Sequence, residues 1–293
     1  MSGQPRAASS VAAEIEEQRG SNASAVPHFD AFAGHRAHLT ELALSGVSPG
    51  SGARLCVLGA GNCYDLELDR LAGVFAEIHL VDLDPAALAR ARDRVTETLR
   101  SKITCHAPLD LTGLFDRLER WRSFQVQPAE LFEHPGRTAQ AIAQKLPGPF
   151  DVVLSACVLS QMQLAALHVM SSGHRLFEPV RQLINLAHLR SLASLVAPGG
   201  RALLVNDVAS EADYPLGSAA QSADLRPLLA ELVGAGKVIF AVRPDLLAWT
   251  VREDPVLNRS TTLSEPLAAW LWHNGPERIF LVYAMELRPA TGA

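Results

Sequence analysis

The 293-residue sequence has few cysteines, and their spacing limits what they can do. None of the four forms a C-x-x-C pair, so neither a cysteine zinc site nor a thioredoxin-like redox motif is indicated. Cys56 and Cys105 fall within apolar runs, Cys63 follows a glycine pair, and Cys157 follows another apolar run. We expect all four to be buried free thiols.

The sequence also lacks a dense block of lysine and arginine and any long apolar run. The formal net charge is −5 and the isoelectric point is near 6.1, which does not favour a nucleic-acid partner. No apolar run reaches the roughly 20 residues that cross a bilayer, and the chain does not start with a basic segment followed by an apolar one. We therefore expect a soluble, cytoplasmic protein with no membrane partner.

Two catalytic patterns are missing as well. There is no G-x-S-x-G nucleophile elbow, which disfavours a serine hydrolase. No His, Asp and Glu residues recur at metal-ligand spacing, so no metal site is predicted. Of the ten histidines, His168, His174 and His273 have the best positions for a role near a ligand, whereas His188 fits a packed or surface helix position.

The stretch from Arg54 to Asp84 organises the rest of the chain. Residues 55–58 form an apolar run without alternation, as in a parallel strand buried on both faces, and Gly59-Ala60-Gly61 ends it. A helix is expected over 65–75 and a second strand over 77–81, closed by Asp82. Such a β-α-β unit suits a nucleoside, because the glycine turn can approach the ligand closely and the acid can accept both ribose hydroxyls.

The third glycine position separates two readings of this unit. A dinucleotide-binding fingerprint has G-x-G-x-x-G, whereas Tyr64 occupies the last position here. An NAD(P)-dependent oxidoreductase is therefore the weaker interpretation.

Four segments resemble class I S-adenosylmethionine-dependent methyltransferases: LGAGN, LVDLDP, FDVVLSA and APGGRALLV. The resemblance covers roughly residues 28–289. It implies an α/β fold, a Rossmann-like doubly wound sheet that is mostly parallel and has an antiparallel last strand over 278–287. It also implies S-adenosyl-L-methionine as the cofactor and methyl transfer as the activity.

The same resemblance assigns the cofactor-binding residues. Asp82 would bind the ribose, Asp110 the adenine amino group, and Leu83 and Leu111 would enclose the adenine. For Asp110 a turn-forming aspartate is an equal alternative, and the two leucines can simply fill the core. The complete predicted set is Gly59, Ala60, Gly61, Asn62, Asp82, Leu83, Asp110, Leu111 and Ser155. Asp84 is predicted to be the N-cap of the helix that begins at Pro85.

The domain organisation follows from composition. Residues 1–27 have little to bury and are expected to be a disordered leader, and residues 28–290 to form one S-adenosylmethionine-binding domain. Residues 28–52 would supply helices that act as a lid or that pack on the sheet edge. The insertion at 112–149 has no assigned role, and Trp270 and Trp272 are placed in a turn that lines a pocket or joins the core.

The resemblance implies methyl transfer by in-line displacement, and the acidic charge balance favours a small-molecule acceptor. No N-P-P-Y or D-P-P-Y sequence is present, which disfavours methylation of amino groups on nucleic-acid bases. A regulatory module that binds the nucleoside without turnover remains an alternative. The sequence identifies no catalytic residue and does not indicate an oligomeric state.

Overall fold

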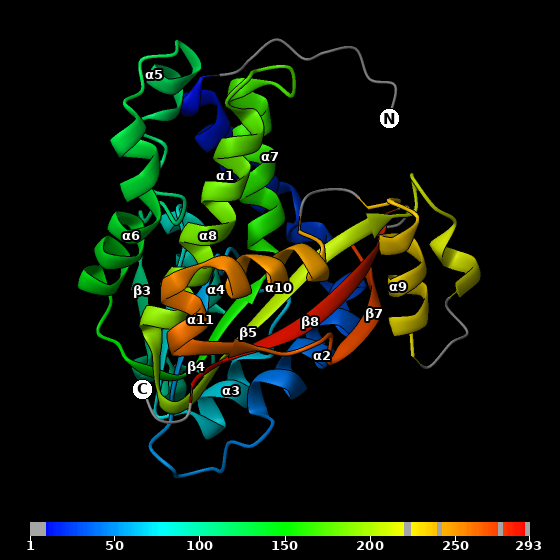
Figure 1. Cartoon of the computed structure of the whole chain (residues 1–293). Helices are drawn as coiled ribbons and strands as arrows, with labels where there is room; N and C mark the ends of the chain where they lie inside the picture. The colour runs from blue at the N-terminus through cyan, green and yellow to red at the C-terminus, as the bar shows by residue number, and fades with distance from the viewer. Residues whose placement is uncertain (1–9, 220–223, 239–241, 275–277, 291–293) are drawn as a thin grey trace.

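The computed structural model describes residues 10–219, 224–238, 242–274 and 278–290, and its centre is one mixed β-sheet (Figure 1). The strand order is β3-β2-β1-β4-β5-β8-β6, and β7 also pairs with β8. The strands are β1 (Arg54–Leu58), β2 (Glu77–Val81), β3 (Ile103–His106), β4 (Phe150–Ala156), β5 (Val196–Ser210), β6 (Thr261–Leu263), β7 (Ala268–His273) and β8 (Ile279–Pro289).

The strand directions confirm the predicted fold class. Strands β3, β2, β1, β4 and β5 run parallel to one another. Strand β8 is antiparallel to β5 over most of its length, as expected for the last strand. Strands β6 and β7 pair with successive parts of β8, both antiparallel to it.

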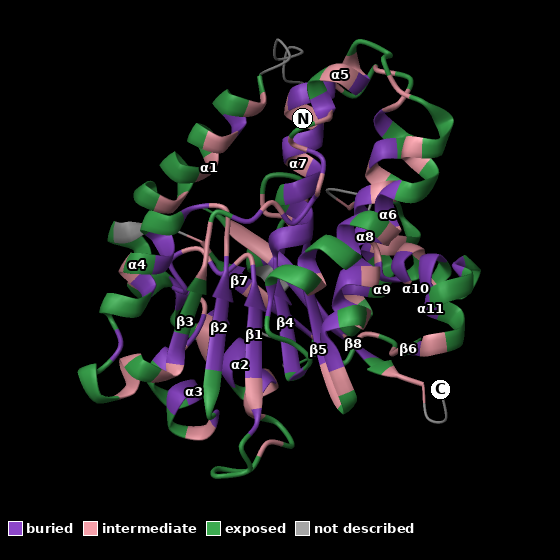
Figure 2. Ribbon diagram, turned by 90° about the vertical axis from the view of Figure 1, so that its left-hand side faces the viewer, coloured by how far each residue is buried: buried purple, intermediate pink, exposed green. Residues whose placement is uncertain are grey.

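The central strands are buried on both faces, which explains their uninterrupted apolar sequences. In β1, Cys56 and Leu58 belong to one apolar cluster, whereas Leu55 and Val57 belong to the cluster on the opposite face. The colouring by burial in Figure 2 shows the centre of the sheet enclosed in this way. Because these strands are parallel, their carboxyl ends lie at the same edge of this buried sheet.

Helices cover both faces of this sheet. One apolar cluster takes residues from α5–α8, α10 and α11, the other takes residues from α2–α4, and α9 packs in a third cluster with β7 and β8. None of the helices in the described part of the chain has the length and apolar character that crossing a membrane requires. The α-helices are α1 (Val11–Ser24), α2 (Ala33–Leu44), α3 (Leu68–Val74), α4 (Pro85–Asp93), α5 (Leu118–Arg122), α6 (Pro128–Lys145), α7 (Val158–Met170), α8 (Phe177–Leu195), α9 (Arg226–Gly234), α10 (Pro244–Glu253) and α11 (Pro255–Ser260). The 3-10 helices are η1 (Val26–Phe32), η2 (Glu97–Lys102) and η3 (Leu216–Ala219).

Residues 11–24, which fall within the expected disordered leader, form helix α1. Helix α1 begins after Ser10, whose hydroxyl accepts a hydrogen bond from the backbone of Ala13 at 3.1 Å. The helix has few apolar side chains to bury. Its contacts with the rest of the domain are mainly polar and are described below. Helices are found before β1 where residues 28–52 were expected to supply them: η1 and α2 span residues 26–44, and α2 packs against β7 and α3.

The C-terminal part of the chain differs from its sequence pattern in two places. Two apolar runs there, 238–242 and 247–251, are strand-like in the sequence, but 247–251 lies in α10, where Pro244, Leu247 and Val251 recur at helical spacing on its buried face. The expected turn at 270–274 is largely β7, in which Trp270 and Trp272 belong to one apolar cluster and Ala269 and Leu271 pack in another. The other strand-like segment, 238–242, falls mostly outside the described residues.

The four cysteines are free thiols, but they are not all buried. Cys56, Cys63 and Cys157 are buried, as expected, whereas Cys105 is exposed. Strand β3 is the outermost strand at its end of the sheet, so one side of it has no neighbouring strand to cover it.

Candidate functional site

The turn after β1 is held against the end of β2. The backbone amides of Gly59 and Ala60 both donate to the carbonyl of Val81, at 2.9 and 3.0 Å. Gly59 has a φ of +70°, and a Cβ built there would lie 2.3 Å from Cγ2 of Val158, the first residue of α7. Glycine is therefore required both by the backbone conformation and by the close approach of α7.

The two acids that follow β2 have different partners. The carboxylate of Asp82 accepts hydrogen bonds from the backbone amides of Gly61 and Asp84, each at 2.8 Å. Burial nevertheless raises the pKa of Asp82 above its ordinary value, and the amides act against that rise. Asp84 accepts from the amide of Ala86 at 2.9 Å, which confirms its role as the N-cap of α4.

Asp110 shapes the loop after β3. Its Oδ1 accepts from the amide and the hydroxyl of Thr112, at 2.8 and 2.6 Å, and its Oδ2 accepts from the amide of Phe115 at 3.0 Å. It is therefore a turn-forming aspartate, the alternative that the sequence left open. It also contributes to the wall of the pocket described next.

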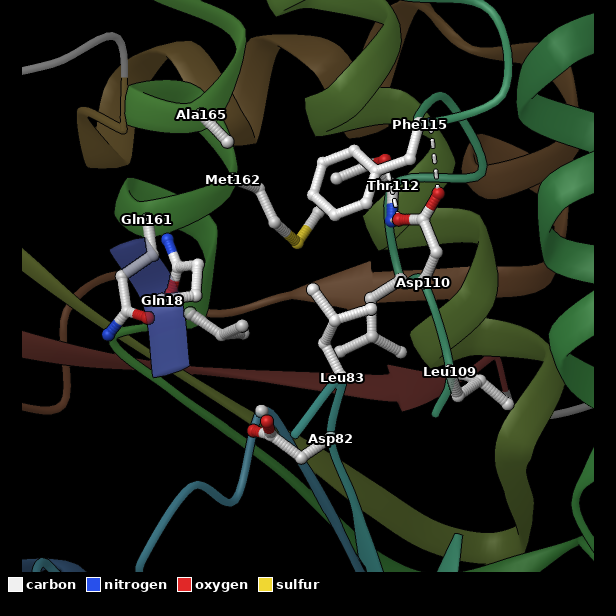
Figure 3. A pocket seen from close by; sticks show the side chains of 13 residues that line it. Gln18, Asp82, Leu83, Leu109, Asp110, Thr112, Phe115, Gln161, Met162 and Ala165 are labelled. Atoms are coloured by element: carbon white, nitrogen blue, oxygen red, sulfur yellow. Dashed lines mark hydrogen bonds between the residues drawn. The ribbon is translucent and has the colours of Figure 1, made fainter. Parts of the chain in front are cut away.

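One pocket lies at the carboxyl ends of β1, β2 and β3 (Figure 3). It encloses about 490 Å³, part of which is open to solvent. Five of the nine predicted site residues line it: Gly59, Asp82, Leu83, Asp110 and Leu111. The sequence therefore located the floor and one wall of the pocket.

The other predicted residues lie outside the pocket lining. Ala60 and Gly61 belong to the adjoining turn, and Asn62 is buried with its amide bonded to the carbonyl of Asn22 and its Oδ1 to Arg90. Ser155 is completely buried in β4, where its hydroxyl lies 2.7 Å from Nε2 of His188. Side chains alternate along a strand, and the position of Ser155 faces the core instead of the ligand edge.

The second wall of the pocket was missed by sequence reasoning. Gln161, Met162 and Ala165 come from α7, Gln18 comes from α1, and Phe115 comes from the loop after β3. The i, i+1, i+4 spacing on α7 was a usable signal once the helix was placed after β4. No signal near Gln18 predicted that α1 would reach the pocket.

Other residues singled out in the sequence have structural roles. Trp270 donates to Nδ1 of His35 at 3.0 Å, and Trp272 stacks on the same imidazole, so both tryptophans belong to the core. Nε2 of His174 lies 2.9 Å from the carbonyl of Arg122, and His168 contacts α1. His168, His174 and His273 are not among the residues that line the pocket.

No protein-family model matches the sequence, and no curated protein matches it. Comparison with solved structures finds an arsenic(III) S-adenosylmethionine methyltransferase from Chlamydomonas reinhardtii, with 18% identity and a TM-score of 0.35, over 84% of this chain and 66% of that chain. It also finds an S-adenosylmethionine-dependent methyltransferase from Anabaena variabilis, with 12% identity and a TM-score of 0.44, over 87% and 84% of the two chains. A candidate methyltransferase from Streptococcus mutans, solved with S-adenosylhomocysteine, has 13% identity and a TM-score of 0.40, over 87% and 98%.

This chain spans just under two thirds of the length of the Chlamydomonas enzyme. At these identities and TM-scores the likeness carries neither an activity nor an acceptor over to this chain. The site geometry described above is independent of these comparisons.

Proposed function

We propose that this protein is an S-adenosylmethionine-dependent methyltransferase that acts on a small molecule. The observation that carries the proposal is the pocket in which Asp82, Leu83, Asp110 and Leu111 converge from two neighbouring strand ends, beside the glycine turn. The sequence resemblance selected these residues independently of the fold. Their convergence supports a nucleoside site at the position where open α/β sheets bind ligands.

The residues present fit the cofactor. The pocket is partly open to solvent and combines apolar side chains with a few polar ones, as small-molecule sites usually do. Asp82 offers carboxylate oxygens for ribose hydroxyls, and Leu83 and Leu111 offer apolar surface for an adenine ring. The backbone of the Gly59–Gly61 turn would contact the methionine end of the cofactor.

The bound cofactor would supply an electrophilic methyl group, so the protein needs mainly to position an acceptor and exclude water. Among the residues that line the pocket, the only titratable side chains are Asp82 and Asp110. Both are engaged by backbone amides, and neither is arranged as a general base. Because no lining residue is arranged to remove a proton, the pocket favours an acceptor that needs no general base, such as a thiolate, a neutral amine or an enolate.

Two features argue against an NAD(P)-dependent oxidoreductase. Tyr64 takes the place of the third glycine, is buried, and packs edge-on against Phe29 with ring centroids 5.3 Å apart. Strand β8 completes the sheet in the antiparallel direction, whereas a dinucleotide domain normally ends on parallel strands.

Calorimetric titration tests the proposal. S-adenosylmethionine and S-adenosylhomocysteine should bind to the purified protein with one site per chain, and NADH should not bind. A screen with methyl-labelled cofactor and small thiols, amines and enolisable compounds should then show label transfer. Binding of NADH alone would contradict the proposal, and tight cofactor binding without transfer to any acceptor class would favour the regulatory module.

A further inference from the structure

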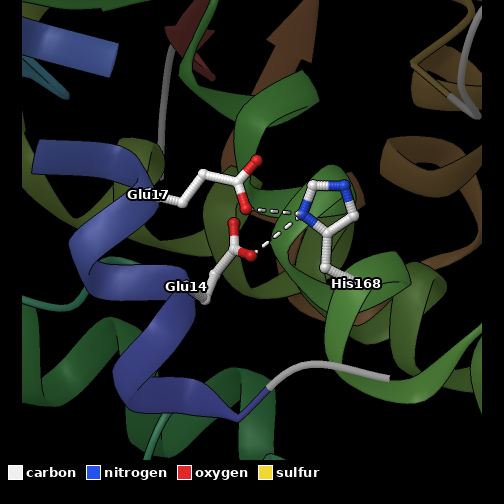
Figure 4. Close-up of side chains that lie close together, drawn as sticks. All are labelled: Glu14, Glu17 and His168. Atoms are coloured by element: carbon white, nitrogen blue, oxygen red, sulfur yellow. Dashed lines mark hydrogen bonds and ion pairs between the residues drawn. The ribbon is translucent and has the colours of Figure 1, made fainter. Parts of the chain in front are cut away.

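A second site can be assembled from helix α1 and helix α7, which are in contact with each other and both contribute residues to the pocket. Glu14 and Glu17 are three residues apart on α1 and therefore share a helix face. His168 faces them from α7: its Nδ1 lies 2.9 Å from a carboxylate oxygen of Glu14 and 3.9 Å from one of Glu17 (Figure 4). One ligand atom from each residue lies within 4.8 Å of the other two.

The three side chains of this cluster differ in their exposure to solvent. The side chain of Glu14 is 1% exposed, that of His168 is 14% exposed, and that of Glu17 is 41% exposed. Glu14 is the buried residue of α1, so this helix places a carboxylate where an amphipathic helix would place an apolar side chain. A buried carboxylate requires a positive partner, and the open side leaves room for water ligands.

We propose that Glu14, Glu17 and His168 form a binding site for a divalent transition-metal ion, with zinc as the best match. Zinc binds imidazole nitrogen and carboxylate oxygen at about 2.0–2.2 Å, so two ligands of one ion lie at most roughly 4.4 Å apart. Both distances from His168 fall below that limit. Magnesium and calcium take oxygen ligands, and the imidazole therefore selects against them.

The position of this site links it to the pocket. Glu14, Gln18 and Asn22 recur every four residues along the inner face of α1. Gln18 lines the pocket, and the amide of Asn22 donates to a carboxylate oxygen of Asp84 at 3.1 Å. A metal ion at Glu14, Glu17 and His168 would join α1 to α7 and hold this inner face over the pocket. This coupling, unlike the metal site itself, rests on the proposed function.

Metal binding is tested with zinc alone, on full-length protein first treated with a chelator. Calorimetry should show one zinc ion per chain, and Glu14→Gln and His168→Ala should each weaken binding by at least roughly tenfold. Glu16→Gln is the matched control, because Glu16 lies on the outer face of the same helix and pairs with Arg19. Absence of zinc binding, or equal affinity in the three variants, would overturn the proposal.

A substitute variant guards against misfolding of His168→Ala, and a hydrogen-exchange measurement tests the metal site without the cofactor. If His168→Ala loses the circular-dichroism spectrum of the parent, His168→Gln replaces it, since glutamine is also a good helix former and keeps a polar side chain of similar length. Amide hydrogen exchange over residues 11–24 should slow when zinc is added to the parent protein and should not change in Glu14→Gln. Unchanged exchange in the parent would overturn the clamping of α1.

The coupling has its own readout. S-adenosylhomocysteine should bind more tightly with zinc than with chelator present, and this difference should vanish in Glu14→Gln. If S-adenosylhomocysteine binds under neither condition while zinc still binds, the proposed function fails and the metal site stands. If the affinity for S-adenosylhomocysteine is the same with zinc and with chelator, the coupling is wrong.

Discussion

Gly59 and Val158 are in contact so close that the first cannot carry a side chain: a Cβ on Gly59 would lie 2.3 Å from Cγ2 of Val158. The contact joins the turn after β1 to the first residue of α7, two segments that both border the pocket. The position of α7 relative to the sheet is therefore fixed at the ligand edge itself.

Gly59→Ala should destabilise the fold by about 2–5 kcal/mol. Alanine at a φ of +70° costs about 1–2 kcal/mol, and the overlap with Val158 adds about 1–3 kcal/mol. Urea denaturation measures the loss, and Val158→Ala in the same chain should recover only a part of the overlap cost, because Cβ of Val158 would also lie 2.5 Å from the added Cβ. Gly73→Ala is the control: that site is helical with open space around it, and alanine there should be neutral or stabilising by about 0.5–1 kcal/mol. Equal effects at the two glycines would contradict the packing described.

Asp82→Asn should weaken S-adenosylhomocysteine binding without unfolding the domain, although its NH2 group would face one of the two backbone amides that donate to the carboxylate. Asparagine keeps the shape and one acceptor oxygen but loses the charge, and a charge-assisted hydrogen bond contributes about 1.5–3 kcal/mol, which is roughly 10- to 150-fold in affinity. Calorimetry of the variant beside Asp116→Asn, an exposed acid that does not line the pocket, checks this expectation. An affinity equal to that of the parent would remove Asp82 from the site.

The buried pair of Ser155 and His188 predicts a loss of stability in acid. Burial lowers the pKa of His188 from 6.5 to about 4. Above pH 6.5 the imidazole is neutral in both states, so it contributes no pH dependence. As the pH falls toward 4, the unfolded chain takes up a proton that the folded chain does not, which costs the fold about 3 kcal/mol.

The double variant Ser155→Ala, His188→Leu isolates this contribution. Replacing both partners leaves neither a lone buried hydroxyl nor a titrating imidazole, so stability near pH 7.5 should change little. Between pH 6.5 and 4 its free energy of unfolding should fall less steeply than that of the parent by up to about 3 kcal/mol. His35 and His134, whose pKa values burial lowers to about 3 and about 4, remain in both proteins and cancel in the comparison. Parallel pH profiles would show that His188 has the same pKa in the folded and unfolded chain, which would contradict this expectation.

Local rules account for the parts of the fold that the sequence predicted. Strands β2 and β4 have the predicted bounds, and Asp84 caps α4, because continuous apolar runs and capping residues act over a few residues. The pocket floor followed from these elements, since parallel strands bring their carboxyl ends to one edge.

The rest depends on contacts that no local pattern contains. Glu14 and His168 are 154 residues apart, and only the packing of α1 on α7 brings them together. Ser155 was placed at the ligand because it lies near the end of a strand, but the side of the strand on which it lies depends on His188, 33 residues away. In α10 the apolar residues fit a short strand as well as a helix face, and tertiary packing selected the helix.

The hydrogen bond between Asn22 and Asp84 predicts how α1 can be released and restored. Asn22→Asp keeps size and nearly the same helix propensity but sets a negative charge about 3.1 Å from the carboxylate of Asp84. Amide exchange over residues 11–24 should accelerate in this variant. Adding Asp84→Asn should return exchange to near the parent rate, because asparagine can donate to the new carboxylate and is as good an N-cap for α4 as aspartate.

Gly20→Ala provides the opposite change on the same helix. Gly20 lies inside α1 with no atom near its missing Cβ, so alanine should stabilise the helix by about 1 kcal/mol and slow exchange roughly fivefold. The two variants therefore separate helix formation from docking: Gly20→Ala acts on the first, and Asn22→Asp acts on the second. If Asn22→Asp and its double variant with Asp84→Asn exchange at the same rate, the pairing of these two residues does not hold α1 over the pocket. If all three variants match the parent, α1 opens by a route that neither its helix propensity nor this contact controls.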